Sequence, residues 1–210
     1  MNTLPPLLPP LGDRRHQRVG LLGGSFNPAH EGHLHISAAA QRVLGLDQVW
    51  WLVSPQNRLK ATKGMAPFAR RLADARMLAA TQRIVVSDIE QTLGTVRTAD
   101  TLAALKRRYP RIAFVWLMGA DNLAQIPQWW RWADIYRLVR VAVFDRSPYS
   151  YRALAGAAAQ RFAAARREPK RLFAARLPAW SWVPIRRHPA SATAIRANDR
   201  TVSSRKRPAK

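Results

Sequence analysis

Short apolar runs alternate with longer amphipathic stretches along most of the chain. The short runs have the length of buried strands, and several of them end at glycine or proline. They predict strands over residues 18–22, 48–53, 83–86, 112–118, 139–144 and 179–183. The stretches between them predict helices over residues 33–44, 67–80, 98–109, 127–138, 150–167 and 191–198.

This alternation predicts right-handed crossover connections and a parallel sheet with helices on both faces. We therefore expect an α/β fold, namely a Rossmann-like, doubly wound parallel sheet in a single domain with a short C-terminal helical segment. Ligands of such sheets bind at the carboxyl ends of the strands, near the point where the strand order reverses. The loops after the first, second and fourth strands are the candidate site.

The two ends of the chain differ from the region between them. Residues 1–17 begin with an apolar stretch that prolines break and that no Lys or Arg precedes, which predicts an irregular tail rather than a signal peptide. Residues 18–198 are the expected domain, and residues 199–210 are expected to be a basic, solvated tail. No stretch approaches the ~18 uninterrupted apolar residues of a membrane-spanning helix, so we expect no membrane partner.

The composition narrows the function classes. The 210 residues include 35 Lys and Arg against 12 Asp and Glu, a formal charge of +23, and no cysteine. The lack of cysteine excludes a disulfide scaffold, an iron–sulfur cluster and a cysteine nucleophile, and it suits the cytoplasm, where we expect the protein. The basic residues are spread along the chain, so we expect polyanionic small molecules rather than nucleic acid as partners.

The segment after the first predicted strand, GGSFNPAHEGH over residues 23–33, carries the candidate chemistry. It is neither a dinucleotide fingerprint nor a P-loop. Paired glycines nevertheless let backbone amides approach a ligand, and the helix start that follows favours an anion. His30 and His33 are three residues apart at this helix start, so both can point at the same phosphate. Alternatively, the two histidines are packed polar residues without a ligand. A metal cluster with His35 is another, although H-E-x-H lacks the H-E-x-x-H spacing, and we expect no protein metal site.

This segment resembles the signature of the nucleotidyltransferase superfamily with an H-x-G-H motif. Later segments match the same pattern in order: LVSPQN at 52–57 with Lys60, RTADTL at 97–102, MGADNL at 118–123 followed by Trp129 and Trp130, and SATAIR at 191–196. Together they resemble the bacterial nicotinate-nucleotide adenylyltransferases over roughly residues 18–198. The chain departs from that pattern at Asn27 in place of Asp, at Ala192 in place of Ser, and at Arg97 in place of an aromatic residue.

The resemblance implies a reaction of NAD biosynthesis, in which the adenylyl group of ATP passes to nicotinate mononucleotide and pyrophosphate leaves. The attacking phosphate is already ionised at neutral pH, so catalysis reduces to positioning and charge stabilisation, without a general base. The implied cofactor is Mg²⁺, bound mainly through the ATP phosphates. The implied partners are ATP and nicotinate mononucleotide.

The resemblance also assigns roles to individual residues. His30 and His33 are the implied catalytic residues, which hydrogen-bond the α-phosphate. The implied ATP and phosphate ligands are Gly23, Gly24, Ser25, Phe26, Lys60, Ser191, Thr193 and Arg196. The implied ligands of nicotinate mononucleotide are Asn57, Thr98, Asp121, Trp129 and Trp130, with Trp129 stacked on the pyridine ring. A solvated surface position is the alternative for Lys60, and a helix-capping role is the alternative for Asp121.

Two other functions stay open at this point. One is a related nucleotidyltransferase with another acceptor: pantetheine phosphate or glycerol phosphate, which the Thr98 and Trp129 segments disfavour, or nicotinamide mononucleotide. The other is a basic nucleic-acid-binding module, which predicts clustered basic residues or exposed stacking aromatics that the sequence does not display. Residues 129, 130 and 132 are all tryptophan, and within one helix they cannot all face the core. We expect at least one of them to be exposed or to line a pocket.

Overall fold

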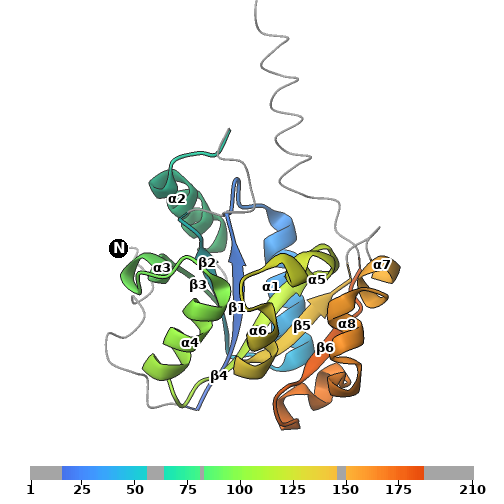
Figure 1. Cartoon of the computed structure of the whole chain (residues 1–210). Helices are drawn as coiled ribbons and strands as arrows, with labels where there is room; N and C mark the ends of the chain where they lie inside the picture. Colours follow the sequence, from blue (N-terminus) through green and yellow to red (C-terminus); the bar gives the residue numbers. More distant parts are fainter. Residues whose placement is uncertain (1–15, 56–63, 81–82, 146–149, 187–210) are drawn as a thin grey trace, which may run out of the picture.

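The computed structural model describes residues 16–55, 64–80, 83–145 and 150–186 (Figure 1). In this part of the chain six strands form one parallel sheet in the order β3-β2-β1-β4-β5-β6. The strands are β1 Arg18–Gly24, β2 Gln48–Val53, β3 Ile84–Ser87, β4 Ala113–Gly119, β5 Arg140–Phe144 and β6 Trp180–Val183. This topology confirms the predicted Rossmann-like, doubly wound fold.

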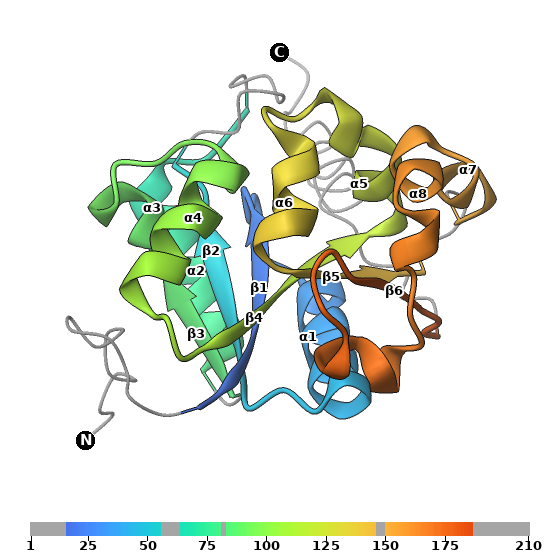
Figure 2. The ribbon, with the colours of Figure 1, turned by 60° about the horizontal axis from the view of Figure 1, so that its bottom comes forward.

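Helices cover both faces of the sheet. The α-helices are α1 Glu31–Leu44, α2 Phe68–Ala79, α3 Ile89–Thr92, α4 Thr98–Arg108, α5 Ala120–Gln125, α6 Trp132–Leu138, α7 Ser150–Leu154 and α8 Ala157–Arg161. Short 3-10 helices are η1 Ile126–Gln128, η2 Ala163–Ala165 and η3 Pro169–Ala174. Helices α1 and α2 and the turn η3 pack on one face, and α4 to α8 pack on the other, where α4 lies beside α6 (Figure 2). Among the described helices, none combines the length and apolar character needed to cross a bilayer.

The central residues of the strands are almost all apolar because each face of the sheet is buried. In β2, Val49, Trp51 and Val53 lie in the core beneath α1 and α2. Trp50 and Leu52, which alternate with them, lie in the core beneath α4 and α6. Because the strands are packed on both faces, their ends are held in place. The loops that follow the strands therefore start from fixed positions.

The structure interrupts two of the predicted helices. Residues 127–138 form η1 and α6 rather than one helix, because Trp129 is extended and Arg131 has a left-handed φ of 49°. Residues 150–167 form α7, α8 and η2, because the backbone of Gly156 is extended between the two helices. The hydrophobic pattern does not predict α3, α5 or η3, which are too short to show a helical period. The helix predicted over residues 191–198 lies outside the described residues.

Candidate active site

The predicted site lies where the sheet changes its order of connection. β1 and β4 are hydrogen-bonded neighbours, although β2 and β3 lie between them in the chain. Their carboxyl ends carry Gly24 and Gly119, and α1 and α5 start beyond these glycines. In doubly wound sheets this edge is where ligands bind. The glycine-rich segment and the MGADNL segment therefore meet at the same edge, as the sequence predicts.

Gly23 and Gly24, which end β1, differ in whether the surrounding packing requires glycine at their position. A Cβ on Gly23 would lie 2.3 Å from Cη2 of Trp116, because the indole of this β4 residue packs directly over Gly23. A Cβ on Gly24 would meet only the ring of Phe26, at an ordinary contact distance of 3.5 Å. Gly23 is therefore required by packing between β1 and β4. Its predicted contact, and that of Gly24, with phosphate stay predictions.

The rings of His30 and His33 cap the first turn of α1 by accepting hydrogen bonds from backbone N–H groups. The Nδ1 atom of His30 accepts from the Gly32 N–H at 3.1 Å, and Nδ1 of His33 accepts from the His30 N–H at 3.1 Å. The two ring centroids are 3.9 Å apart. Nδ1 of His33 also lies 3.3 Å from the His30 carbonyl oxygen, so the tautomer of His33 decides which of these two backbone groups it bonds to. The structure brings the two predicted catalytic residues together.

Packing from the neighbouring core fixes the orientation of His33. The ring of Phe26 lies 4.7 Å from the His33 ring and stacks on Trp51 at 5.1 Å, with the Phe26 side chain only 2% exposed. Trp51 Nε1 donates to Ser37 Oγ at 2.9 Å, and that hydroxyl donates to the His33 carbonyl oxygen at 2.8 Å. The side chain of Phe26 thus contacts both His33 and Trp51 and restricts the orientation of the His33 ring.

Asn27 explains one departure from the family pattern. Its Oδ1 accepts from the Ala66 N–H at 3.0 Å, and its Nδ2 donates to the Gly64 carbonyl oxygen at 3.2 Å. An ionised aspartate can accept hydrogen bonds but cannot donate one to a carbonyl. The asparagine therefore ties the glycine-rich loop to the segment before α2 in a way that aspartate does not match.

Arg71 is a site residue that sequence reasoning missed. Its side chain is 2% exposed and donates to four backbone carbonyl oxygens. They belong to residues directly after β1, directly after β2 and shortly before α2: Ser25, Ser54 at 2.9 Å, Pro55 at 3.0 Å and Ala66 at 3.0 Å. The guanidinium lies 5.4 Å from the ring centroid of Phe68, and its burial lowers the pKa of Arg71.

The predicted acceptor residues gather on the other face of the sheet, at the starts of α4 and α5 and between η1 and α6. Thr98 is the first residue of α4, and Asp121 lies half-buried in the first turn of α5. Trp129 is half-buried against the core, and among the described residues its Nε1 has no hydrogen-bond partner. Trp130 is 55% exposed, which confirms that at least one of these tryptophans leaves the core. The guanidinium of Arg97 lies 4.2 Å from the centroid of the Trp130 ring.

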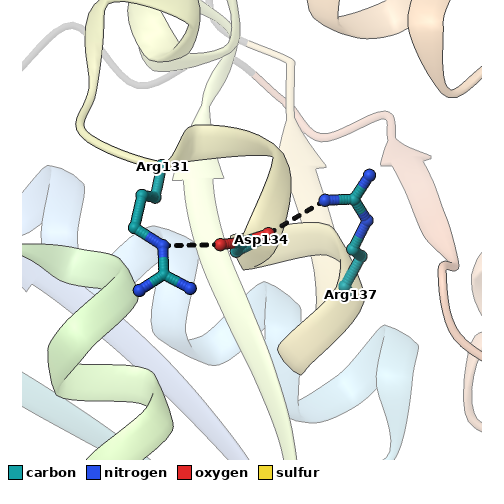
Figure 3. Close-up of polar contacts among 3 residues, drawn as sticks. All are labelled: Arg131, Asp134 and Arg137. Atoms are coloured by element: carbon teal, nitrogen blue, oxygen red, sulfur yellow. Dashed lines mark hydrogen bonds and ion pairs between the residues drawn. The ribbon is translucent and has the colours of Figure 1, made fainter.

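A small ionic network holds the first turn of α6. Oδ2 of Asp134 lies 2.7 Å from Nε of Arg131, and Oδ1 of Asp134 lies 2.9 Å from Nη1 of Arg137 (Figure 3). Hydrogen bonds from Arg131 and then Arg137 lower the pKa of Asp134. The Asp134 N–H also donates to the Arg131 carbonyl oxygen at 2.9 Å. Because Arg131 has a left-handed backbone, this network stabilises the break that carries Trp129 and Trp130.

Several predicted residues lie outside the described part of the chain: Asn57, Lys60, Ser191, Thr193 and Arg196. The last described residue, Arg186, approaches α1, where its carbonyl oxygen lies 2.6 Å from His35 Nε2. Among the described residues, no group of three or more His, Asp or Glu side chains is placed to hold a metal ion.

Comparisons with known proteins show which family this chain belongs to. A family model described as cytidylyltransferase-like matches residues 21–198. A probable nicotinate-nucleotide adenylyltransferase of Parvibaculum lavamentivorans is 62% identical over 136 residues, which are 65% of this chain and 68% of that protein. A protein of the same name from Cereibacter sphaeroides is 53% identical over 182 residues, which are 87% of this chain and 98% of that protein.

A solved structure shares the fold. The nicotinic acid mononucleotide adenylyltransferase of Plasmodium falciparum, complexed with NaAD, matches with a TM-score of 0.67 at 15% sequence identity. The match covers 87% of this chain and 83% of that chain. At this identity the likeness concerns the arrangement of the sheet and its helices.

Proposed function

We propose that this chain, which belongs to the cytidylyltransferase-like family, transfers the adenylyl group of ATP to nicotinate mononucleotide. The products are nicotinate adenine dinucleotide and pyrophosphate, and the reaction is a step of NAD biosynthesis. Two relatives with this activity in their names, at 62% and 53% identity, support the assignment. The observation that carries it is the His30–His33 pair, which caps α1 at the carboxyl end of β1, with the ring centroids 3.9 Å apart.

The reaction needs little covalent help from the protein. A phosphate oxygen of the mononucleotide attacks the α-phosphorus of ATP, the new P–O bond forms, and the bond to pyrophosphate breaks. The nucleophile is already ionised, so no side chain has to remove a proton. The Nε2–H groups of His30 and His33 would then donate to the α-phosphate oxygens, where charge develops in the transition state.

ATP would enter as its magnesium complex. Mg²⁺ keeps several waters and is bound largely by nucleotide phosphates, so it demands few protein ligands. The Gly24–Phe26 loop and the start of α1 would contact these phosphates, because free N–H groups and the helix dipole favour negative charge there. Lys60, Ser191, Thr193 and Arg196 are proposed to complete the phosphate contacts.

The mononucleotide would bind on the face covered by α4 and α6. Thr98, Asp121, Trp129, Trp130 and Asn57 are its proposed contacts. Trp129 is proposed to stack on the pyridine ring; its Nε1 is buried, and no hydrogen-bond partner for it lies in the described part of the chain. Arg97 adds a positive charge over Trp130, which suits an acceptor that carries a carboxylate. We propose the cytoplasm as the location, since the substrates are nucleotides and the chain contains no cysteine.

The proposal is tested by pyrophosphate release from ATP with a panel of acceptors. Nicotinate mononucleotide, nicotinamide mononucleotide and pantetheine phosphate are compared at equal concentrations. A site built around a carboxylate leaves the amide mispaired by roughly 3 kcal/mol, so we expect at least ~10²-fold higher kcat/KM for the acid. Equal use of the amide would reject nicotinate as the acceptor. Tight RNA binding without any turnover would reject the enzyme assignment altogether.

A further inference from the structure

Arg71 joins segments that are far apart in the sequence. Ser25 lies 46 positions before it and Ser54 lies 17 positions before it, yet both carbonyl oxygens accept from the same Nη1 atom. Nη2 donates to the Pro55 carbonyl oxygen and Nε donates to the Ala66 carbonyl oxygen. All three nitrogen atoms of the guanidinium therefore donate hydrogen bonds to backbone carbonyls. The guanidinium therefore sets the distance between the loop after β1, the loop after β2 and the start of α2.

The bond to Ser25 has a consequence for the next peptide group. In a trans peptide the C=O of one residue and the N–H of the following residue point in opposite directions. Because the Ser25 carbonyl points at Arg71, the Phe26 N–H points away from it. Among the described residues, no atom accepts from this N–H. Arg71 thus fixes the direction of this backbone donor, in the loop whose Phe26 ring lies 4.7 Å from the His33 ring.

The charge of Arg71 is not neutralised where it is buried. Its partners are carbonyl oxygens, and within the described residues no carboxylate lies at ion-pair distance from it. Buried cations are normally paired with anions, because an uncompensated charge in the interior is unfavourable. A cation held in this way, directly behind a loop with a free amide, is complementary to an anionic ligand.

We propose that Arg71 is a positioning residue for the nucleotide phosphates. It fixes the peptide between Ser25 and Phe26 so that the Phe26 N–H faces the ligand, and it places a positive charge behind this loop. The proposal rests on the proposed function for the identity of the ligand. Lysine cannot replace it, because an ammonium group lacks the planar fork that reaches carbonyls on several sides.

Arg140 provides a matched control at the opposite edge of the sheet. It is the first residue of β5 and donates to the carbonyl oxygens of Leu172 at 3.0 Å, Phe173 at 3.0 Å and Ala175 at 3.1 Å. Its guanidinium lies 5.3 Å from the Phe173 ring, as that of Arg71 lies 5.4 Å from the Phe68 ring. The two arginines make the same kind of bonds, and only Arg71 makes them to the candidate site.

The experiment compares Arg71→Lys with Arg140→Lys in the full chain. Binding of ATP with Mg²⁺ is measured by calorimetry without acceptor, and unfolding is measured by denaturant. We expect both variants to be destabilised, and Arg71→Lys alone to raise the Kd of ATP at least tenfold. In turnover assays its KM for ATP should rise in the same way, while the KM for nicotinate mononucleotide changes less than twofold.

An unchanged ATP Kd in folded Arg71→Lys, or an equal rise in Arg140→Lys, would overturn the proposal. If Arg71→Lys does not fold, Phe68→Leu decides, because it weakens the packing under the guanidinium: a Kd raised at least twofold supports the role, and an unchanged Kd rejects it. Absence of turnover by the wild-type protein would count against the proposed function. The ratio of ATP dissociation constants would still test the role of Arg71.

Discussion

The two edges of the sheet contain similar arginine clusters but differ in what surrounds them. At the amino edge, meaning the side of the sheet where the strands begin, Arg140 donates to backbone carbonyls of one short segment, residues 172–175. Arg18 packs on the ring of Phe173 in that segment. At the carboxyl edge, Arg71 joins three separate segments. Its bonds end in a loop that carries a free amide and two capping histidines. The same chemistry closes the fold at one edge and organises a candidate site at the other.

The two ends of the strands therefore offer different positions for a binding site on this fold. At the amino edge each of these contacts joins one segment to one other, such as the bond of 2.8 Å from the Arg18 N–H to Oδ2 of Asp47, which lies 29 positions later. The carboxyl edge gathers loops from distant parts of the sequence, so donors from several segments converge there. Substitutions at the amino edge should therefore change stability alone, and those at the carboxyl edge should change binding or turnover.

The largest effect is expected for His33→Ala. Losing one donor to the developing charge should lower kcat roughly 10²–10³-fold. The matched variant at the amino edge is Asp47→Ala, which removes the acceptor of the Arg18 N–H and should leave kcat within about twofold. Steady-state kinetics and denaturant unfolding of both variants give the comparison. A folded His33→Ala variant with nearly normal kcat would remove His33 from the mechanism.

Trp129→Leu is expected to have the next largest effect. Stacking of an aromatic side chain on a base contributes about 1–3 kcal/mol, so losing it should raise the KM for nicotinate mononucleotide roughly tenfold. The KM for ATP should stay close to its normal value. Trp180→Leu, at the first position of β6, removes an indole that is 1% exposed and should lower stability without changing the KM of either substrate. An unchanged acceptor KM in Trp129→Leu would reject the stacking role.

Gly23→Ala and Gly45→Ala compare the two ends of the strands through substitutions that should lower stability by similar amounts. Gly23→Ala forces a Cβ to within 2.3 Å of the Trp116 ring, and such overpacking destabilises by about 1–3 kcal/mol. Gly45→Ala, at a φ of +62° after α1, should cost a similar amount, about 1–2 kcal/mol, through backbone strain. We expect only Gly23→Ala to raise the KM for ATP as well, since Gly23 leads into the phosphate loop. Equal kinetics for the two variants would mean that the loop tolerates the displacement.

The smallest effect concerns pH. Burial raises the pKa of Glu90, although hydrogen bonds from Thr101 and Ser54 oppose the shift. A carboxyl group whose pKa is higher in the folded state binds its proton more tightly there. Its contribution therefore favours folding at low pH and is lost as the pH rises above its ordinary pKa. Denaturant midpoints of wild type and Glu90→Gln between pH 4 and pH 7 should show a smaller decline for the variant. Parallel curves would contradict the assignment.

The local signals were sufficient to predict the sheet and the histidine pair. β2 begins and ends at the residues predicted for it, because QVWWLV is apolar throughout and Ser54-Pro55 follows at once. His30 and His33 were predicted to meet because their spacing and the preceding glycines define a helix start within a few residues. Such features depend on neighbours in the sequence, which a single chain displays.

The features that the sequence did not reveal depend on distant contacts or on backbone strain. Arg71 is one of 35 basic residues, and only its bonds to carbonyls up to 46 positions away distinguish it. The break before α6 follows from a left-handed Arg131, a conformation that the hydrophobic pattern does not indicate. Asn57, Lys60, Ser191, Thr193 and Arg196 lie outside the described residues, and their roles stay predictions.

We propose that the phosphates of ATP bind at the carboxyl end of β1, against the first turn of α1. A crystal structure of the full chain with a non-hydrolysable ATP analogue and Mg²⁺ tests this most directly. We expect the α-phosphate within hydrogen-bonding distance of His33 Nε2, and a phosphate oxygen accepting from the Phe26 N–H. Phosphates bound at the amino edge near Arg140, or an analogue that leaves both His33 and the Phe26 N–H without a phosphate contact, would contradict it.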